Sequence, residues 1–414
     1  MGKRILLIGY NFSPEPTGIG KYSGEMIHWL ANAGYDCIVV TTYPYYPFWK
    51  VQEPYHKNRF WYLKETKSFE SGGKITVYRC PMYVPSEPTG KKRMLLDVSF
   101  MVSAFFQLVM LLFKKKCHTV ITVVPSFQFG LLGYFYKVFK NSKTVYHIQD
   151  MQIEAAQDLN MITSKKVINI LYKLEQFIFD KTDVISSISE KMVSKIEEKA
   201  QKGVVLFPNW SDTSFFSPIS EKAMLKKDFG FDERDQVVLY SGAIGEKQGL
   251  EAIIYAAETF KDRAEVKFVI CGTGPYKKKL EALAKTLNLE NVLFFPLQPM
   301  EKFNEFLNMA DMHLVIQKAK ASDLVMPSKL TTILSVGGLV LITANEDSGI
   351  YAVTKKYHMG FLVDAENQSA LNKGIEEALT SPERLKIMKN ARRYAENYLD
   401  IDNVMKTFLE NIAS

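Results

Sequence analysis

Residues 237–260 read VVLYSGAIGEKQGLEAIIYAAETF, and this stretch predicts a strand, a glycine loop and a helix. Its first four residues favour β structure, and apolar residues spaced three and four apart follow Gly249. Glycine lets the backbone approach a ligand closely, and the first amides of a helix have no partner within it. Together with the positive charge of Lys247, the pattern is typical of a phosphate or diphosphate site. A tight turn in a parallel sheet would need only the glycines and would leave Lys247 as a solvated surface charge.

The composition describes a folded protein with more than one domain, and we expect two. The chain has 414 residues, of which 47% are hydrophobic and 23% are charged. Its net charge of +7 is not gathered into a basic tail, so we expect no nucleic-acid partner and favour a membrane surface or a phosphate-bearing substrate. The four cysteines form no Cys-x-x-Cys pair, which favours buried thiols in the cytoplasm over disulfides or zinc ligands.

Strands and helices alternate through the first half of the chain, which predicts a doubly wound parallel sheet over residues 1–208. The apolar run near the N-terminus is too short for a signal peptide, so we expect it to form the first strand. A proline-rich loop then leads to Gly18, Gly20 and a helix. Ser23 stands where a dinucleotide fingerprint has its third glycine, so the pattern disfavours a nicotinamide or flavin cofactor.

Polar side chains follow the strand that we expect at residues 144–147. His147 ends this strand, Asp150 comes next, and Glu154 lies one helical turn further on. Ligands of α/β sheets bind at the carboxyl ends of the strands, so we expect these three side chains beside the ligand. A histidine at a strand end is also a common structural hydrogen-bond partner, and we weigh a functional role above that alternative.

Two segments of the first half are unusually apolar. Aromatic residues crowd residues 43–62, where they could stack on sugars, lie at a lipid interface or, as clustered aromatics most often do, pack under their own loop. Residues 94–113 carry one charge in twenty positions, between two basic triplets. As a helix they would be about 30 Å long, enough to cross a bilayer. Because a strand of the same sheet is expected next, we expect no crossing; a buried core helix and a helix lying in the membrane surface remain open.

The second half repeats the alternation over residues 209–382 and predicts a second doubly wound sheet. Gly274 lies in a glycine-rich turn after one of its strands, and helical spacing marks residues 383–414. Two α/β domains closed by C-terminal helices would form a cleft between them, and such clefts bind substrates.

Six motifs of the chain resemble those of the retaining nucleotide-sugar glycosyltransferases of family 4. They read NFSPEPTGIGKYSGEM (11–26), HIQD (147–150), FPNWS (207–211), YSGAIGEKQGLE (240–251), FFPLQ (294–298) and PSKLTTILSVGG (327–338). The resemblance implies the GT-B architecture, in which two Rossmann-like domains face each other across a cleft and C-terminal helices, here 383–414, pack back on the first domain. It also implies a donor bound mainly on the second domain, an acceptor on the first, and no cofactor, since the nucleotide sugar is a substrate.

Within the family, the motifs are most similar to those of enzymes of exopolysaccharide, capsule or O-antigen assembly. This implies a saccharide acceptor linked to polyprenyl diphosphate and a peripheral position at the cytoplasmic face of the inner membrane. The resemblance points to GDP-fucose as the donor, although no residue favours guanine over uracil. The alternatives are a non-catalytic, membrane-associated partner of a polysaccharide assembly complex and a nucleotide-sugar epimerase on the same fold.

The expected site residues follow from the motifs and from the needs of the chemistry. A departing nucleoside diphosphate must be stabilised by a metal or by cations and helix amides. The one Asp-x-Asp motif, at 400–402, lies in the C-terminal tail, so we predict metal-independent chemistry with Lys247 and Lys329 as the cations. His147 and Asp150 would lie beside the reacting sugar, and front-face attack would retain the anomeric configuration without paired carboxylates at hydrolase spacing. The further donor-binding residues expected are Gly18, Gly20, Gly242, Gly245, Gly249, Gly274, Leu297, Ser328 and Thr332, and the acceptor-side residues are Lys21, Tyr22 and Glu154.

Several positions depart from the family pattern. Ala243 stands where the family has an arginine after the glycine, and Gln248 where it has a lysine before the last glycine. Thr332 takes the place of the second of two glutamates, and residues 320–324 supply no counterpart of the first, which leaves the ribose without its usual partner. Lys247, shifted by one position, would then have to supply part of the missing charge.

Overall fold

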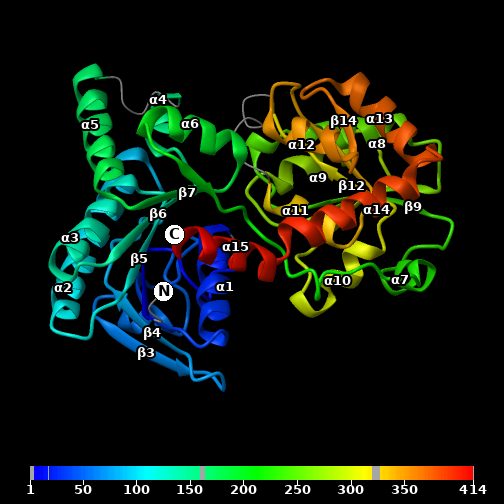
Figure 1. The fold of residues 1–414 in the computed structure, drawn as a ribbon. Coiled ribbons are helices and arrows are strands. Elements are labelled where there is room, and N and C mark those ends of the chain that lie inside the picture. The colour runs from blue at the N-terminus through cyan, green and yellow to red at the C-terminus, as the bar shows by residue number, and fades with distance from the viewer. Residues whose placement is uncertain (1–3, 17, 159–163, 319–326, 414) are drawn as a thin grey trace. The chain divides into compact units, whose positions relative to one another are not determined.

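The computed structural model describes residues 4–16, 18–158, 164–318 and 327–413, which form two α/β units (Figure 1). The first unit comprises Met1–Phe207 and Thr407–Ser414, and the second comprises Pro208–Lys406. Each unit contains a mainly parallel sheet with helices between its strands, as the alternation in the sequence predicted.

An eight-stranded sheet with the order β3-β4-β2-β1-β5-β6-β7-β8 forms the first unit. Its strands are β1 (Arg4–Ile8), β2 (Asp36–Thr42), β3 (Leu63–Ser68), β4 (Lys74–Cys80), β5 (Thr119–Val124), β6 (Lys143–Ile148), β7 (Val184–Ser187) and β8 (Val204–Leu206). Both faces of β1, β2 and β5 are buried, which explains the unbroken apolar runs of these strands. The order changes direction between β1 and β5, so the loops after these strands are placed to bind a ligand.

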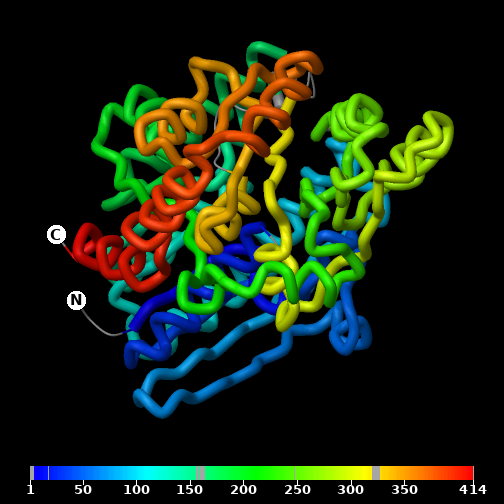
Figure 2. Tube along the Cα trace, turned by 90° about the vertical axis from the view of Figure 1, so that its right-hand side faces the viewer, coloured from blue at the N-terminus to red at the C-terminus, as the bar shows by residue number. Residues whose placement is uncertain are grey.

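The β3–β4 hairpin is the part of this sheet that the sequence pattern did not indicate. β3 runs antiparallel to β4, and Figure 2 shows the two strands as a long blue hairpin. The sequence of β3, LKETKS, is mostly exposed and charged, as is common for an edge strand, so it lacks the alternation that marks a half-buried strand.

The described helices of the first unit connect these strands. They are α1 (Gly18–Asn32), α2 (Gly90–Leu112), α3 (Gly130–Lys140), α4 (Gln152–Asp158), α5 (Lys165–Lys181) and α6 (Glu190–Ala200), with the short 3-10 helices η1 (Tyr55–Asn58) and η2 (Phe127–Phe129). Within the aromatic segment, Tyr43 and Tyr45 are buried, whereas Phe48, Phe60 and Trp61 are exposed. Packing under the loop therefore accounts for only part of that segment.

A six-stranded parallel sheet with the order β11-β10-β9-β12-β13-β14 forms the second unit. Its strands are β9 (Gln236–Ser241), β10 (Val266–Cys271), β11 (Val292–Phe295), β12 (Met312–Val315), β13 (Val340–Thr343) and β14 (Phe361–Val363). The helices are α7 (Lys222–Asp228), η3 (Glu246–Gln248), α8 (Glu251–Thr259), α9 (Lys277–Thr286), α10 (Met300–Asn308), α11 (Ser328–Ser335), α12 (Gly349–Tyr357), α13 (Gln368–Thr380) and α14 (Arg384–Tyr394). Alternate residues of β9 and β10 pack into two separate cores, one on each face. The order changes direction between β9 and β12, which places the glycine loop after β9 at the switch point.

The C-terminal helices differ from the expectation that residues 383–414 all pack on the first domain. The π-helix η5 (Ala395–Leu399) and α15 (Ile401–Ala413) follow α14, and the chain belongs to the second unit up to Lys406. Ala391, Ala395 and Leu399, spaced four apart, are buried in a core of the second unit that also contains residues of α11 and α12. The last residues return to the first unit, where the ring of Phe408 stacks on that of Phe207 at 3.7 Å.

Candidate functional site

The glycine loop after β9 is built by close contact with the loop after β10. The amide of Gly242 donates a hydrogen bond of 3.0 Å to the last carbonyl of β10, at Cys271, and the amide of Ile244 donates one of 2.9 Å to Thr273 in that second loop. A Cβ atom on Gly272 would collide with the carbonyl oxygen of Gly242, and one on Gly274 with that of Ile244. Gly274, a predicted donor-binding residue, is therefore required by the packing of the two loops.

The other glycines of the loop shape its path into α8. Gly249 has a φ of +70°, a left-handed conformation that favours glycine. A Cβ atom on Gly245 would lie 2.7 Å from Oε1 of Gln248, a buried oxygen for which the described residues offer no hydrogen bond. Lys247 lies in η3 between them, and its side chain is outside the part of the chain that the structure describes.

Lys329 reaches the same loop from α11. Its Nζ donates a hydrogen bond of 2.8 Å to the hydroxyl of Tyr240 and lies 4.0 Å from the centroid of that ring. The Tyr240 hydroxyl donates in turn to the carbonyl oxygen of Ala243 at 2.8 Å. A Cβ atom on Gly242 would lie 3.1 Å from Lys329 Nζ, so the lysine borders the first glycine of the loop. No described carboxylate pairs with this ammonium, and burial lowers the pKa of Lys329 to about 7.

The remaining expected donor residues lie near the same edge of the sheet. Ser328 is the exposed first residue of α11, whereas Thr332 is buried and donates a hydrogen bond of 2.9 Å to the carbonyl oxygen of Lys329. Leu297 is 60% exposed in the loop after β11. Residues 320–324, the expected region of the first family glutamate, lie outside the described residues.

Lys318 is a cation of this region that sequence reasoning missed. It follows β12, and a Cβ atom on Gly249 would lie 3.4 Å from both Cγ and Cε of Lys318. Its side chain therefore packs against the last glycine of the loop, while Lys329 packs against the first. Its position just after a buried strand was the only signal that could have pointed to it.

In the first unit, Glu15 explains a glycine at the start of α1. This buried carboxylate accepts hydrogen bonds of 3.0 Å from the backbone amides of Tyr45 and Tyr46, and burial raises its pKa. A Cβ atom on Gly20 would collide with the Glu15 side chain. Gly18, with a φ of +59°, begins the helix. These two predicted donor residues thus already have reasons within the first unit to be glycine.

The expected acceptor residues of α1 differ in exposure. Lys21 forms an ion pair of 3.7 Å with Glu25, one helical turn away, and its Nζ lies 4.9 Å from the ring of Tyr22. Tyr22 is buried in the core. Of the two, Lys21 has the side chain that is better placed to meet a solvent-borne ligand.

His147 is buried, and both of its ring nitrogens have a neighbour. Nδ1 lies 3.0 Å from the hydroxyl of Ser186, and Nε2 lies 3.2 Å from Nε2 of Gln149. The imidazole packs edge-on against Phe207, and burial lowers its pKa to about 3. A neutral, enclosed imidazole of this kind favours the structural role over a role beside the sugar.

Asp150 and Glu154 have different surroundings in the loop and helix after β6. Asp150 is exposed. Glu154 forms an ion pair of 2.5 Å with Lys199, which also pairs with Glu175 at 2.6 Å. Glu154 therefore joins α4 to α5 and α6.

Asp97, the one charge within residues 94–113, is a second residue that sequence reasoning left unassigned. It is buried, and its Oδ2 accepts a hydrogen bond of 3.2 Å from Gln152, whose own Oε1 accepts one of 3.1 Å from the Phe127 amide. Burial raises the pKa of Asp97 to about 6. This network ties α2 to the loops after β5 and β6, and a lone carboxylate in an apolar helix was its signal.

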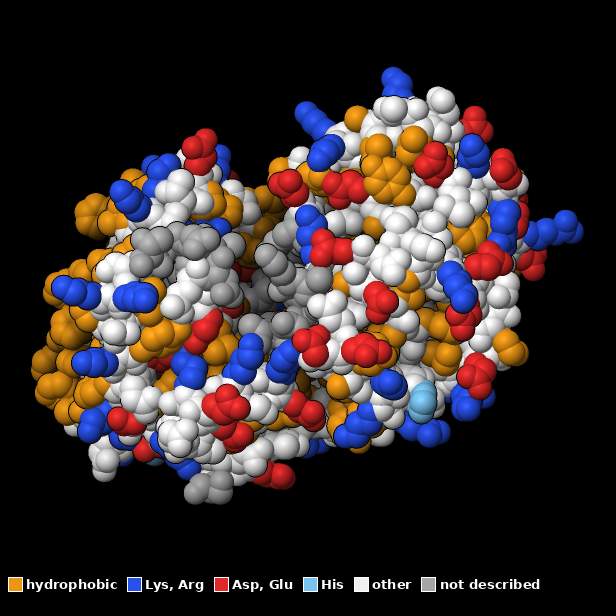
Figure 3. All heavy atoms as spheres, turned by 90° about the horizontal axis from the view of Figure 1, so that it is seen from above, with side chains coloured by type: hydrophobic (Ala, Val, Ile, Leu, Met, Phe, Trp, Pro, Cys, Tyr) orange, Lys and Arg blue, Asp and Glu red, His pale blue; other side chains and the backbone are white. Residues whose placement is uncertain are grey.

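One face of α2 is buried and the other is exposed. By length and composition, α2 is the one helix among the described residues that could span a bilayer, but part of it packs into the core of the first unit. The exposed apolar residues, which we call the α2 face, are Met94, Leu95, Val98, Val102, Phe105, Phe106, Met110 and Phe113, with Val138 and Phe139 at the end of α3. Phe135 contacts the rings of both Phe105 and Phe139, which makes the face continuous. Figure 3 shows hydrophobic side chains gathered at the left of the view with lysines and arginines around them.

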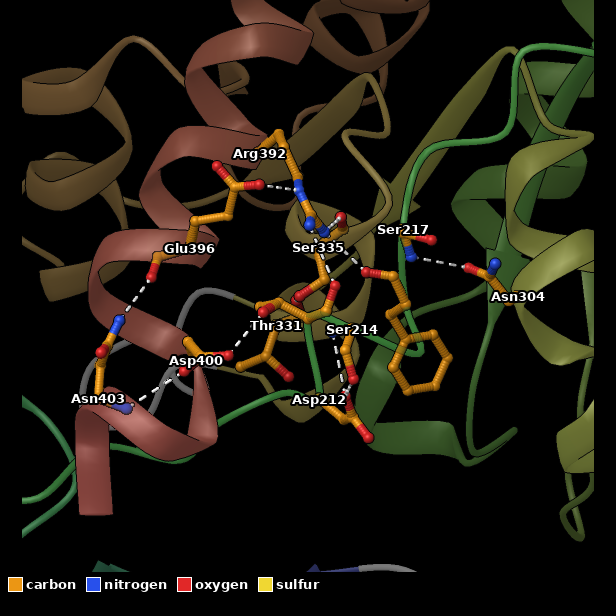
Figure 4. A network of polar contacts seen from close by, with 12 residues as sticks. Asp212, Ser214, Ser217, Asn304, Thr331, Ser335, Arg392, Glu396, Asp400 and Asn403 are labelled. Carbon is orange, nitrogen blue, oxygen red and sulfur yellow. Dashed lines mark hydrogen bonds and ion pairs between the residues drawn. The ribbon is translucent and has the colours of Figure 1, made fainter. Parts of the chain in front are cut away.

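Arg392 of α14 anchors the end of α11 that lies away from Lys329 (Figure 4). Its guanidinium donates to the carbonyl oxygens of Ser335 at 2.5 Å, Phe216 at 2.8 Å and Thr213 at 3.0 Å, and it pairs with Glu396 at 2.7 Å. The last carbonyls of a helix lack partners within it, and a cation there opposes the negative end of the helix dipole.

Asp400 of the Asp-x-Asp motif has a structural role as a hydrogen-bond acceptor at the start of α15. It accepts hydrogen bonds from the amides of Asp402 and Asn403 at the start of α15 and one of 2.6 Å from the hydroxyl of Thr213. Among the described residues, no group of three or more histidine, cysteine, aspartate or glutamate side chains could hold a metal ion. Metal independence stays a prediction.

Comparison with known proteins agrees with the geometry. Residues 221–396 match the family described as glycosyl transferases group 1. The chain is 39% identical over 417 residues to an Escherichia coli K12 protein named as a colanic acid biosynthesis glycosyl transferase, WcaI, and the match covers 99% of each protein.

Solved structures share the fold across almost the whole chain. Sucrose-phosphate synthase from Thermosynechococcus elongatus superposes with a TM-score of 0.76 at 15% identity, covering 99% of this chain and 98% of that one. WaaG, a glycosyltransferase involved in lipopolysaccharide biosynthesis, superposes with a TM-score of 0.69 at 17% identity, covering 99% of this chain and 100% of its own. The full-length identity to WcaI shows that the chain belongs to the group 1 glycosyltransferases, enzymes with the GT-B fold.

Proposed function

We propose that the protein transfers a sugar from a nucleoside-diphosphate donor to a polyprenyl-diphosphate-linked saccharide in exopolysaccharide assembly. The observation that carries the proposal is the glycine loop after β9, bordered by the partly buried side chain of Lys329. A partly buried cation with no carboxylate partner among the described residues favours an anionic ligand. The similarity to a colanic acid biosynthesis glycosyl transferase supports the class of pathway.

Donor chemistry at this site would depend on stabilising the diphosphate as it leaves. The first amides of α11 have no partner within the helix and carry its positive dipole end, and Lys329 lies in the same turn. Lys247 remains a candidate cation from the loop itself. Such fixed dipoles and charges stabilise developing negative charge without a metal ion. By analogy with the family, we expect the sugar to be transferred with retention of configuration.

The acceptor side of the proposal rests on the α2 face. This continuous apolar surface is flanked by Lys91, Lys92 and Arg93 at one end of α2 and by residues 114–116, all lysine, at the other. An apolar helix face between basic residues favours the surface of a membrane with anionic lipids. A lipid-linked acceptor resides at that surface, so we expect a peripheral protein at the cytoplasmic face of the inner membrane.

The donor itself is proposed from similarity, with GDP-fucose as the first candidate. Titration calorimetry with GDP, UDP, ADP and their sugar conjugates tests it directly, and GDP and GDP-fucose should bind most tightly. A clear preference for UDP would exclude GDP-fucose while leaving the diphosphate site intact.

A transfer assay tests the reaction. The purified protein, anionic vesicles, a polyprenyl-diphosphate saccharide and the preferred labelled donor should yield a labelled lipid, and Lys329→Met should lower the yield strongly. The acceptor-free control must show no sugar epimer, because an epimer formed without acceptor would contradict a transferase. A folded wild-type protein that binds no nucleoside diphosphate would refute the proposed function.

A further inference from the structure

The glycine loop lacks the two cations that its family resemblance leads one to expect. Ala243 follows the first glycine of the loop, and Gln248 precedes the last, where the family has arginine and lysine. A site for a diphosphate needs positive charge close to these two glycines. In this structure, lysines from two neighbouring elements reach these glycines.

Lys329 lies at the first glycine. Its Nζ would be 3.1 Å from a Cβ atom on Gly242, and the hydroxyl of Tyr240 fixes it there with a hydrogen bond of 2.8 Å. The Tyr240 hydroxyl is itself held by the carbonyl oxygen of Ala243. The loop residue that replaces the arginine thus helps to orient a lysine from another element.

Lys318 lies at the last glycine. Its Cγ and Cε would both be 3.4 Å from a Cβ atom on Gly249, so the lysine side chain lies directly against this glycine. The chain that leads to it is fixed, because the amide of Gln317 donates to the Thr343 hydroxyl at 2.8 Å and its carbonyl oxygen accepts from that hydroxyl at 3.0 Å. Among the residues that the structure describes, none forms a hydrogen bond or an ion pair with the Lys318 ammonium.

We propose that Lys318 and Lys329, supplied by the chain after β12 and by α11, bind the donor diphosphate at the two ends of the glycine loop in place of the cations that the loop lacks. Lys318 becomes a diphosphate-binding residue that no motif marks. The inference rests on the proposed function, since it names the cations of the same donor site.

A purely structural role for Lys318 would have a different signature. Lysines that stabilise a fold usually pair with a carboxylate or cap a carbonyl, as Lys222 does with Asp311 and the Ala310 carbonyl in the same unit. Lys318 has no such described partner and is only partly buried, and it lies against a glycine at a sheet switch point. A free ammonium in that position favours a ligand over a packing role.

Binding measurements on matched variants test the proposal. The variants are Lys318→Met, Lys329→Met and Lys318→Arg, with Lys373→Met as a control that removes an exposed charge from α13. Titration calorimetry measures the affinity of each folded variant for GDP, GMP and guanosine, and for the uridine series if that base binds better.

Lys318→Met should weaken diphosphate binding by about tenfold or more and should leave nucleoside binding unchanged, because a charge-assisted contact to phosphate is lost. Lys318→Arg should recover most of the affinity, and Lys373→Met should match the wild type. Unchanged diphosphate affinity in folded Lys318→Met would overturn the inference while the donor site stands. Equal wild-type affinity for diphosphate and nucleoside would overturn the donor site and the inference together. Because Lys329 is partly buried, thermal unfolding must show that the Lys329→Met protein is folded. If it is not, the Lys318→Met result alone decides the inference.

Discussion

Replacing Lys329 with methionine tests whether the partly buried amine of this lysine takes up a proton when a donor binds. Burial lowers the pKa of Lys329 to about 7, so at pH 8 most molecules carry it neutral. A bound diphosphate favours the charged form and therefore raises this pKa. Binding above pH 7 is then coupled to proton uptake, and the affinity of the wild type should fall by up to about tenfold per pH unit between pH 7 and 9.

Titration calorimetry of GDP at pH 7, 8 and 9 measures this dependence. Repeating the titration in buffers of different ionisation enthalpy measures the number of protons taken up on binding. The pH range of 7 to 9 lies above the pKa of the terminal phosphate of the nucleotide, which is about 6. Lys329→Met should bind more weakly, lose the pH dependence and take up no proton, whereas Lys373→Met should behave as the wild type. A wild-type affinity that is constant from pH 7 to 9, or a Lys329→Met protein that keeps the slope, would refute the reasoning.

The same lysine has a predictable effect on the empty protein. The unfolded chain keeps the Lys329 proton up to the ordinary lysine pKa, whereas the folded chain loses it above about 7. The charged lysine therefore lowers the free energy of unfolding by its full amount below pH 7, and this destabilisation decreases as the pH rises. Urea unfolding should show that the stability advantage of Lys329→Met over the wild type shrinks by at most about 1.4 kcal/mol per pH unit from pH 7 to 9.

Four further predictions concern other parts of the chain. His147→Gln should lower the melting temperature and keep most of the turnover, measured in the transfer assay; a large loss of turnover at unchanged stability would restore a catalytic role. Phe106→Asp should weaken binding to anionic vesicles by about tenfold or more in sedimentation, since a phenyl ring contributes about 1.5–3 kcal/mol on burial, while Leu385→Asp on α14 should not. Gly274→Ala should lower the melting temperature and the donor affinity, because its Cβ atom would collide with the loop after β9. Arg392→Met should raise the KM for the donor more than that for the acceptor, and equal changes in both would contradict a role through α11.

The second sheet could be predicted from the sequence because its strands are continuous apolar runs. The central residues of β9 and β10 are buried on both faces of the sheet and are almost all apolar, and a glycine after each strand marks its end. The β3–β4 hairpin could not, since its charged edge strand has no such signal. The packing of the C-terminal helices was also not predictable from the sequence. The spacing of Ala391 and Ala395 indicates a helix, but it does not indicate against which unit the buried side of that helix packs.

The candidate site could be predicted where a residue of suitable chemistry also lies next to a recognisable strand end or helix start in the sequence. Lys329 follows a proline and serine at the start of a helix, so both its charge and its place were readable. Lys318 could not be predicted, because it lies 69 positions from Gly249 in the sequence. The two residues meet only because β9 and β12, the strands that precede them, pair in the sheet. For His147, the strand end indicated the edge of the sheet but not that the ring turns into the core toward Ser186, and its role beside the sugar stays a prediction.

Helix α11 connects these observations physically. Its first turn carries Lys329, whose ammonium borders the glycine loop, and its last turn gives the carbonyl oxygen of Ser335 to Arg392. A cation at the C-terminus and an anion at the N-terminus both lower the energy of the same helix dipole, so the guanidinium favours a helix that is ready to bind an anion. Arg392 also binds the carbonyl oxygens of Thr213 and Phe216, in the segment by which the chain enters the second unit. One guanidinium therefore joins the C-terminal end of α11 to the entering segment, and its loss would free both together.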